Sequence, residues 1–177
     1  SGPIDALTTF EEIYKRPRLV EKLSEFLLIN YAKPGKVHRS FCGLPFDKVC
    51  TTNFDFLIEK QYEILGRHCI PIVEESQLSV GGSESDVVLL KAHGDLHHPS
   101  RLVVTENDYK NFLERAGLLT TYLTNLLMTR TPVFIGYSLD DPDLRHIWDS
   151  IGDSLGNMRR QAFAIVVGAD ETTIEGY

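Results

Sequence analysis

The stretch Val87-Val88-Leu89-Leu90-Lys91-Ala92-His93-Gly94-Asp95 (VVLLKAHGD, residues 87–95) decides the fold. Its first four residues are all apolar and lack the polar alternation of a strand that faces water on one side. Such a short apolar run predicts a strand buried on both faces, which is typical of a parallel sheet covered by helices. The strand delivers a polar, glycine-containing turn, His93-Gly94-Asp95, at its carboxyl end.

Similar apolar runs and helical patterns alternate along the rest of the chain. Further strands are expected at residues 48–51, 69–73, 132–135 and 162–167, with a short extended piece at 102–105. Apolar residues at helical spacing predict helices at about 9–15, from Pro17 to Tyr31, 36–42, 55–65, from Thr105 on, 118–129 and from Asp141-Pro142 on. Thr105 is expected to cap its helix with Asp108 at the third position, a variant of the capping box. Residues 74–86 show no periodicity and are expected to form a mobile loop. This alternation predicts an α/β fold, a parallel sheet with helices on both faces, in a single domain over residues 1–177.

The composition is that of a globular domain with an acidic surface. The 177 residues carry a net charge of −7. Nucleic acids and anionic membranes attract basic patches, so neither is expected as a direct partner. Cys42, Cys50 and Cys69 include no C-x-x-C pair, which argues against a disulfide framework and for a reducing, cytoplasmic setting. No apolar run approaches the ~18 residues of a membrane span.

Three of the predicted strands end in polar loops. These loops are Thr51–Asp55, His93–Asp95 and Gly136–Ser138. In parallel sheets, ligands bind beyond the carboxyl ends of the strands. The sequence therefore predicts that the three loops converge on one binding site.

The first loop leads from a strand into a helix. Backbone N–H groups at a helix N-terminus have no partner within the helix, so they favour an anion or a carbonyl. Asn53 and Asp55 are therefore candidate ligand-binding residues. Asn and Asp are also favoured helix caps, and the residues alone leave both interpretations open.

The second loop contains a candidate general base. A histidine at the carboxyl end of a strand titrates near neutral pH, and Gly94 would let a ligand approach the backbone closely. The alternative is a structural histidine in a turn. His97 and His98 lie nearby, but no further ligand follows at a suitable spacing, so no metal site is predicted.

The third loop suits phosphate or ribose binding. Gly136 and Ser138 stand between a strand and a helix, where backbone N–H groups and a hydroxyl can meet a phosphate. A plain strand-to-helix connection with Ser138 in a turn is the alternative. Asp140, Asp141 and Asp143 are interpreted mainly as charges at a helix N-terminus rather than as metal ligands.

Taken together, these segments resemble the SIR2-like family, the bacterial and archaeal relatives of sirtuins. The resemblance extends from about Pro34 to the end of the chain, and the middle piece 102–109 looks like another recurrent segment of the family. It rests mainly on Thr51-Thr52-Asn53-Phe54-Asp55, on Lys91-Ala92-His93-Gly94-Asp95, and on residues 134–144 with Gly136-Tyr137-Ser138-Leu139, in this order.

The resemblance implies a role for each loop in cleaving the nicotinamide–ribose bond of NAD. Asn53 looks like the catalytic asparagine that orients a water or the ribose, and His93 looks like the catalytic base. Asp55 looks like the residue that binds the nicotinamide carboxamide. The remaining residues expected to contact NAD or a related nucleotide are Thr51, Thr52, Gly94, Asp95, Gly136 and Ser138.

The implied function is an NAD hydrolase (NADase) that acts as an anti-phage defence or stress effector, with a fused or associated sensor domain and a homo-oligomeric state as further expectations. The family opens with a strand and a Gly-Ala-Gly-type loop that the chain lacks, so a Rossmann-like sheet missing its first strand is expected. This departure keeps a second interpretation open, a non-catalytic module that binds a nucleotide or ADP-ribose or serves in assembly. The four-cysteine zinc module of deacetylating sirtuins is absent, which argues against deacetylase activity.

Overall fold

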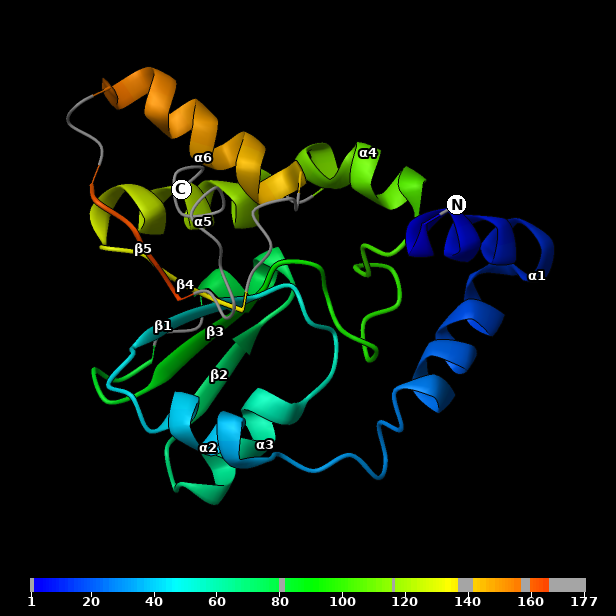
Figure 1. Ribbon diagram of the computed structural model, residues 1–177, viewed down its shortest axis with the longest axis horizontal. Coiled ribbons are helices and arrows are strands. Elements are labelled where there is room, and N and C mark those ends of the chain that lie inside the picture. Colours follow the sequence, from blue (N-terminus) through cyan, green and yellow to red (C-terminus); the bar gives the residue numbers. More distant parts are fainter. Residues whose placement is uncertain (1, 80–81, 116, 137–141, 157–159, 166–177) are drawn as a thin grey trace. The chain divides into compact units, whose positions relative to one another are not determined.

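The apolar run at Val87–Leu90 belongs to the central strand of a parallel sheet (Figure 1). In the computed structural model, which describes residues 2–79, 82–115, 117–136, 142–156 and 160–165, β3 (Val87–Lys91) lies between β1 (Lys48–Thr51) and β2 (Cys69–Ile72). Both neighbours pair with β3 in parallel, with Thr51 opposite Lys91 and Ile72 opposite Leu90. Because the strands point the same way, the segments that follow them leave from one edge of the sheet.

The chain divides into two compact units, Ser1–Leu119 and Thr120–Tyr177. The three-stranded sheet belongs to the first unit. The second unit contains a separate parallel pair, β4 (Val133–Ile135) with β5 (Phe163–Ile165), and helix α6 (Pro142–Leu155). Helix α5 (Gly117–Thr129) begins in the first unit and continues into the second. The predicted Rossmann-like α/β class, a parallel sheet with helices around it, is confirmed, whereas a single domain over all 177 residues stays a prediction.

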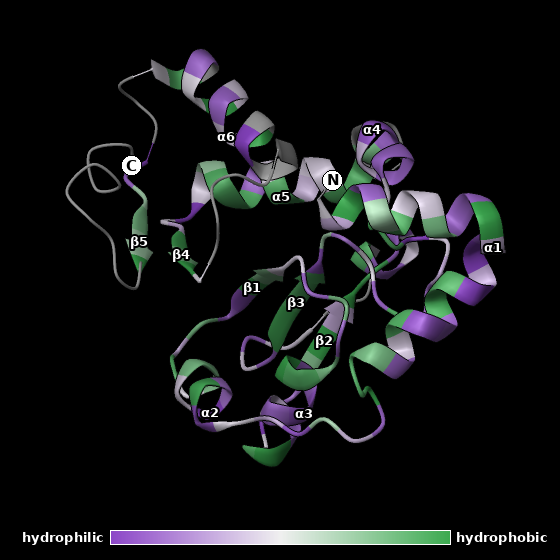
Figure 2. Ribbon diagram, turned by 45° about the vertical axis from the view of Figure 1, so that its right-hand side comes forward, coloured by the Kyte–Doolittle hydropathy of each residue, from purple (hydrophilic) through white to green (hydrophobic). Residues whose placement is uncertain are grey.

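The first unit has its main core between the sheet and two short helices. These are α2 (Lys36–Cys42) and α3 (Leu57–Ile64), both close to the predicted bounds. Figure 2 shows the hydrophobic colour concentrated on β2 and β3. Burial is the largest cause that raises the pKa of Tyr62 and of Cys69 to about 12 each. The core cluster consists of Cys42, Val49, Tyr62, Val87 and Leu89.

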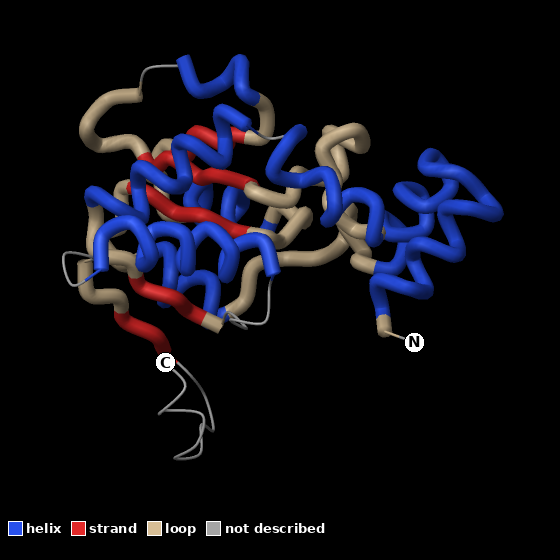
Figure 3. Tube along the Cα trace, turned by 90° about the horizontal axis from the view of Figure 1, so that it is seen from above, coloured by secondary structure: helices blue, strands red, loops and turns tan. Residues whose placement is uncertain are grey.

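The N-terminal helix α1 (Pro3–Phe26) is bent at Lys15 (Figure 3). Lys15 has φ 70° and ψ 161°, a conformation that costs a non-glycine residue about 1–3 kcal/mol. Pro17 lies in the first turn after the bend, where its missing N–H breaks no helical hydrogen bond. Because the backbone at Lys15 is not helical, α1 consists of two helices that meet at the kink, as the sequence predicted, although the first begins at Pro3 rather than near Thr9. The second helix ends at Phe26, so its predicted extension to Tyr31 is wrong.

The residue after the bend, Arg16, connects α1 to the segment that precedes α4 (Glu106–Arg115). Its Nη1 lies 2.8 Å from Asp108 Oδ2, its Nε donates to the Pro99 carbonyl at 3.2 Å, and its Nη2 donates to the Leu102 carbonyl. Asp108 Oδ2 also accepts the Thr105 N–H at 3.0 Å, and the Asp108 N–H donates to Thr105 Oγ1 at 3.4 Å, which confirms the predicted capping box at this helix.

The same bonds control the ionisation of Asp108. Burial by itself raises the pKa of this carboxyl, but the hydrogen bond from Arg16 and the N–H groups of Val104 and Thr105 hold the pKa below its ordinary value. The carboxylate is therefore the form that the folded chain favours.

Two connecting segments are more ordered than their sequences suggest. Residues 74–86 were expected to be mobile, yet Glu75–Ser79 form a 3-10 turn, and the Gln77 side chain accepts the N–H groups of Val73 at 2.6 Å and Glu74 at 2.8 Å. The extended piece at Leu102–Val104 is buried without joining either sheet.

Among the described residues, no helix combines the length and the apolar character that a bilayer span requires.

The bonds to Asp108 predict an acid-dependent loss of stability. Asp108→Asn should lower the free energy of unfolding by about 1.5–3 kcal/mol at neutral pH, the range for hydrogen bonds to a charged group. The unfolded pKa is about 3.9 and the folded pKa is lower, so the carboxylate's contribution is complete above about pH 4 and is lost as the pH falls through the folded pKa. Urea unfolding at several pH values should show the wild-type advantage shrinking below about pH 4.

Glu106→Gln is the matched control, because Glu106 lies on the same helix in an exposed pair with Lys110 at 3.4 Å. Its effect should stay within about 0.5 kcal/mol. A wild-type advantage over Asp108→Asn that persists undiminished through acid pH would contradict this assignment.

Candidate functional site

The segments after β1 and β3 are bonded to each other at the carboxyl edge of the sheet. The Ala92 N–H donates to the Thr51 carbonyl at 2.9 Å, and the Leu96 N–H donates to the Phe54 carbonyl at 3.3 Å. The ring of Phe56 stacks on His97 with 4.2 Å between centroids. The predicted convergence of Thr51–Asp55 with His93–Asp95 is thus present in the structure.

In the first segment, Asn53 is exposed and Asp55 bonds to the first residue of a helix. The Asn53 N–H donates to Thr51 Oγ1 at 3.1 Å, which closes a tight turn directly after β1. Asp55 Oδ1 accepts the N–H of Leu57, the first residue of α3, at 2.9 Å. Thr51 and Thr52 are half-buried. Asp55 thus stabilises the start of α3 from the position before its N-cap, Phe56, and binding of a carboxamide by Asp55 stays a prediction.

In the second segment, His93 is held by aromatic side chains from α4. The imidazole is 4% exposed and lies edge-on to Tyr109, at 5.3 Å and 84°, and to Phe112, at 5.5 Å and 79°. The His93 carbonyl accepts the Val103 N–H at 3.0 Å. Packing of this kind fixes the direction of the ring and leaves it little freedom to rotate. Neither aromatic partner was identified from the sequence, because both come from a helix that starts 13 residues further on.

Gly94 and Asp95 shape the turn that follows. Gly94 has φ 75°, and a Cβ on it would lie 2.5 Å from the Arg101 carbonyl oxygen. The close approach predicted at this glycine is therefore made by the chain's own backbone. Asp95 Oδ1 accepts the N–H groups of His97 at 2.9 Å and His98 at 3.1 Å and lies 2.8 Å from His98 Nδ1.

Lys91 is the residue that sequence reasoning missed. Its side chain is 0% exposed, and its Nζ lies 2.5 Å from the Asp55 carbonyl oxygen and 2.7 Å from Glu59 Oε1. Lysine is almost never fully buried unless it is paired. The sequence signal was a charge at the end of an apolar strand, but the partners that make its burial tolerable lie 32 and 36 residues away.

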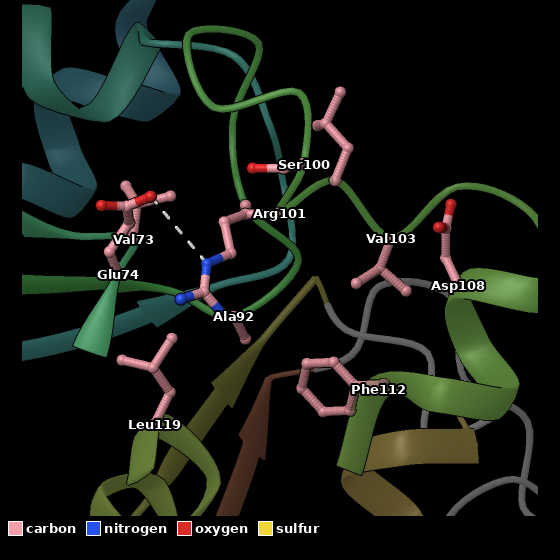
Figure 4. A pocket seen from close by; sticks show the side chains of 11 residues that line it. Val73, Glu74, Ala92, Ser100, Arg101, Val103, Asp108, Phe112 and Leu119 are labelled. Carbon is pink, nitrogen blue, oxygen red and sulfur yellow. Dashed lines mark ion pairs between the residues drawn. The ribbon is translucent and has the colours of Figure 1, made fainter. Parts of the chain in front are cut away.

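A pocket of about 320 Å³ lies on the β2 side of the His93–Gly94 turn (Figure 4). Arg101 Nε and Glu74 Oε1 are 4.0 Å apart in its wall. Phe112, which packs against His93, also lines it. Its described lining takes no residue from Thr51–Asp55 and consists of Val73, Glu74, Ala92, Gly94, Ser100, Arg101, Leu102, Val103, Asp108, Phe112 and Leu119.

The third predicted segment belongs to the second unit. Gly136 is exposed, follows β4 directly and has φ 60°, a conformation that favours glycine. Ser138 lies outside the described residues. Phosphate or ribose binding by these two residues stays a prediction. In the part of the chain that the structure describes, no group of three or more His, Cys, Asp or Glu side chains is placed to hold a metal ion.

The exposed Asn53 and the packed His93 follow two neighbouring parallel strands at the same edge of the sheet. This is the arrangement of a Rossmann-like α/β domain with polar loops at the carboxyl ends of its strands. A family model described as SIR2-like domain matches residues 47–176. The chain therefore belongs to the SIR2-like domain family, as the three segments had indicated.

Individual relatives support the family assignment. The chain is 31% identical over 146 residues to a NAD(+) hydrolase ThsA of Cytobacillus dafuensis, an alignment that covers 81% of this chain and 30% of the relative. It is 28% identical over 166 residues to a NAD(+) hydrolase ThsA of Enterococcus faecium, covering 90% of this chain and 35% of the relative. It is 32% identical over 123 residues to the Defense-associated sirtuin 2 of Bacillus subtilis, covering 67% of this chain and 12% of the relative. The chain thus spans about a third of the ThsA relatives and less of the sirtuin.

The packing at Gly94 predicts a strong penalty for a side chain there. Gly94→Ala should cost about 1–2 kcal/mol for the left-handed backbone and a further ~1–3 kcal/mol for the contact with Arg101. Gly66→Ala is the matched control, because Gly66 has φ 68° and nothing within 4 Å of an added Cβ. Urea unfolding should show the larger loss for Gly94→Ala. Equal losses would mean that the Arg101 backbone shifts away without cost.

Proposed function

We propose that this SIR2-like domain binds NAD and cleaves the nicotinamide–ribose bond, as part of a defence or stress effector. The observation that carries the proposal is the bonded convergence of the Asn53 loop and the His93 turn at one sheet edge. The names of the relatives, NAD(+) hydrolase and Defense-associated sirtuin, support the same activity. In this proposal residues 1–177 form part of one NAD-binding domain.

The proposed reaction consumes one water. The bond between the anomeric carbon and the pyridinium nitrogen breaks with its electron pair going to nicotinamide, which leaves an oxocarbenium-like ribose. Water adds to that carbon and loses a proton, giving ADP-ribose. Asn53 would orient the water or the ribose, and His93 would accept a proton from the water or a ribose hydroxyl. Each group would contribute a few kcal/mol at most, about what one positioned donor or base supplies.

The other site residues would bind and orient NAD. Asp55 would contact the nicotinamide carboxamide, while Thr51, Thr52, Gly94 and Asp95 would line the same edge. Gly136 and Ser138 would contact phosphate and ribose. No metal is required by this scheme, because the cationic pyridinium ring accepts the electron pair of the broken bond and leaves as neutral nicotinamide. A sensor domain in the same protein and a homo-oligomeric assembly are part of the proposal, and the greater length of the relatives is compatible with the former.

A second candidate function is a non-catalytic module that binds NAD or ADP-ribose. It is favoured by the burial of His93, at 4% exposure, and by the hydrogen bond that Asp55 accepts from the first residue of α3, since both residues already have structural roles. Binding without turnover would distinguish this module from a hydrolase.

The test is incubation of the full-length protein with NAD, followed by chromatography for nicotinamide and ADP-ribose. Asn53→Ala should reduce turnover by at least about 100-fold with little change in melting temperature, because the side chain is exposed. His93→Ala should reduce turnover similarly, with some loss of stability from the cavity between Tyr109 and Phe112.

Two matched controls separate loss of chemistry from general damage. Asn107→Ala removes an exposed asparagine from α4, and His68→Ala removes a histidine whose side chain is 72% exposed and pairs with Asp86 at 3.1 Å. Both should retain turnover. NAD binding by calorimetry without any product from the wild type would support the binding module instead, and full turnover in Asn53→Ala would overturn the role of that residue.

A further inference from the structure

We infer that Lys91 is a positioning residue for the reaction proposed above, on which this inference rests: its ammonium group fixes the Asn53 loop and the His93 turn relative to each other without touching the substrate. The three contacts that carry the inference join Lys91 Nζ to the Asp55 carbonyl, to the Glu59 carboxylate and to the Asp95 carboxylate.

On the side of the Asn53 loop, Lys91 holds the entry to α3. The Asp55 carbonyl oxygen, 2.5 Å from Nζ, belongs to the peptide two residues after Asn53. Glu59, 2.7 Å from Nζ, lies in the first turn of α3. The ring of Phe56, between these two, lies beneath the ammonium group with 4.4 Å from Nζ to its centroid. The buried ammonium group thus contacts three residues between Asn53 and the first turn of α3: it bonds to two of them and lies over the ring of the third.

On the side of the His93 turn, Lys91 acts through Asp95. Its Nζ lies 3.6 Å from Asp95 Oδ2, while Oδ1 of the same carboxylate closes the turn through the N–H groups of His97 and His98. Lys91 itself stands two residues before His93 and Asp95 two residues after it. The ammonium–carboxylate contact therefore spans the peptide that carries the imidazole on both sides.

Burial makes this arrangement rigid but also costly to disturb. The side chains of Lys91 and Asp95 are 0% and 5% exposed, and that of Glu59 is 20% exposed. Loss of the ammonium group would leave two carboxylates with reduced compensation, which is strongly destabilising in a protein interior. Replacing both Lys91 and Glu59 by apolar side chains of similar length removes the part of that penalty that comes from Glu59, while Asp95 keeps the N–H groups of His97 and His98. The double variant still lacks the bond to the Asp55 carbonyl, so it separates positioning from charge compensation.

The experiment compares Lys91→Met, Lys91→Met/Glu59→Met and Lys60→Met in the full-length protein. Lys60 is the matched control, since its Nζ also donates to backbone carbonyls, of Ile29 at 3.2 Å and Ala32 at 3.4 Å, but outside the site. NAD turnover, KM and melting temperature are measured for each. Lys91→Met should lose kcat by about 10- to 100-fold with KM within about threefold of wild type.

The double variant is expected to regain melting temperature without regaining kcat, and Lys60→Met is expected to keep wild-type kcat. If the double variant regains turnover together with stability, Lys91 only compensates charge and the inference is wrong. The inference is also wrong if folded Lys91→Met turns over NAD at the wild-type rate. It is wrong as well if the double variant does not fold, because Lys91 would then be needed for folding and not for positioning.

A readout that needs no activity keeps this inference distinct from the proposed hydrolase. The amides of Ala92 and Leu96 bond across the two segments, to the Thr51 and Phe54 carbonyls. Hydrogen exchange at both amides should be faster in Lys91→Met and in the double variant than in wild type, and unchanged in Lys60→Met. A wild-type protein without NAD turnover would overturn the hydrolase proposal, whereas unchanged exchange in the folded double variant would overturn the role of Lys91.

Discussion

The structure depends on β3 being paired in parallel on both sides. Parallel pairing with β1 and β2 sends all three strands to one edge, and the pairing of Thr51 with Lys91 places the first residues of both loops opposite each other. The Ala92 N–H then continues the ladder by one more bond to the Thr51 carbonyl. The polar edge thus depends on strand register, because a slip of one residue would turn every side chain of β3 to the opposite face of the sheet.

The loops at the carboxyl edge of the parallel sheet bury polar groups, and these groups need hydrogen-bond partners. The first unit provides these partners through two cations, one from the sheet and one from α1. Lys91 points from the sheet to Asp55, Glu59 and Asp95, and Arg16 comes from α1 to the carbonyls of Pro99 and Leu102 and to Asp108. Each cation joins a charged partner to backbone carbonyls of an irregular segment. Irregular backbone can therefore remain buried at this edge without losing its hydrogen bonds.

The sequence predicted what depends on local pattern. The strand at Val87–Leu90, the helix at 36–42 and the cap of Thr105 with Asp108 follow from apolar runs, spacing and capping chemistry, and all are present. The burial of Lys91 and the packing of His93 against Tyr109 could not be predicted, because both depend on partners brought together by the tertiary fold. The order at Glu75–Ser79 was missed for a related reason. This segment has no apolar periodicity, and the Gln77 side chain stabilises it by bonding to the backbone before it.

Gly94 shows how one local constraint serves both fold and site. A glycine after a strand in a polar loop suggested a ligand close to the backbone, and the structure places the Arg101–Leu102 backbone in that space. In the same segment the Val103 N–H donates to the His93 carbonyl, and the chain then reaches Thr105, which caps α4 at Glu106. Tyr109 and Phe112 on α4 then reach the imidazole. The absence of a side chain at Gly94 therefore lets the Arg101–Leu102 backbone pack against the turn, and this segment leads into the helix whose aromatic side chains contact His93.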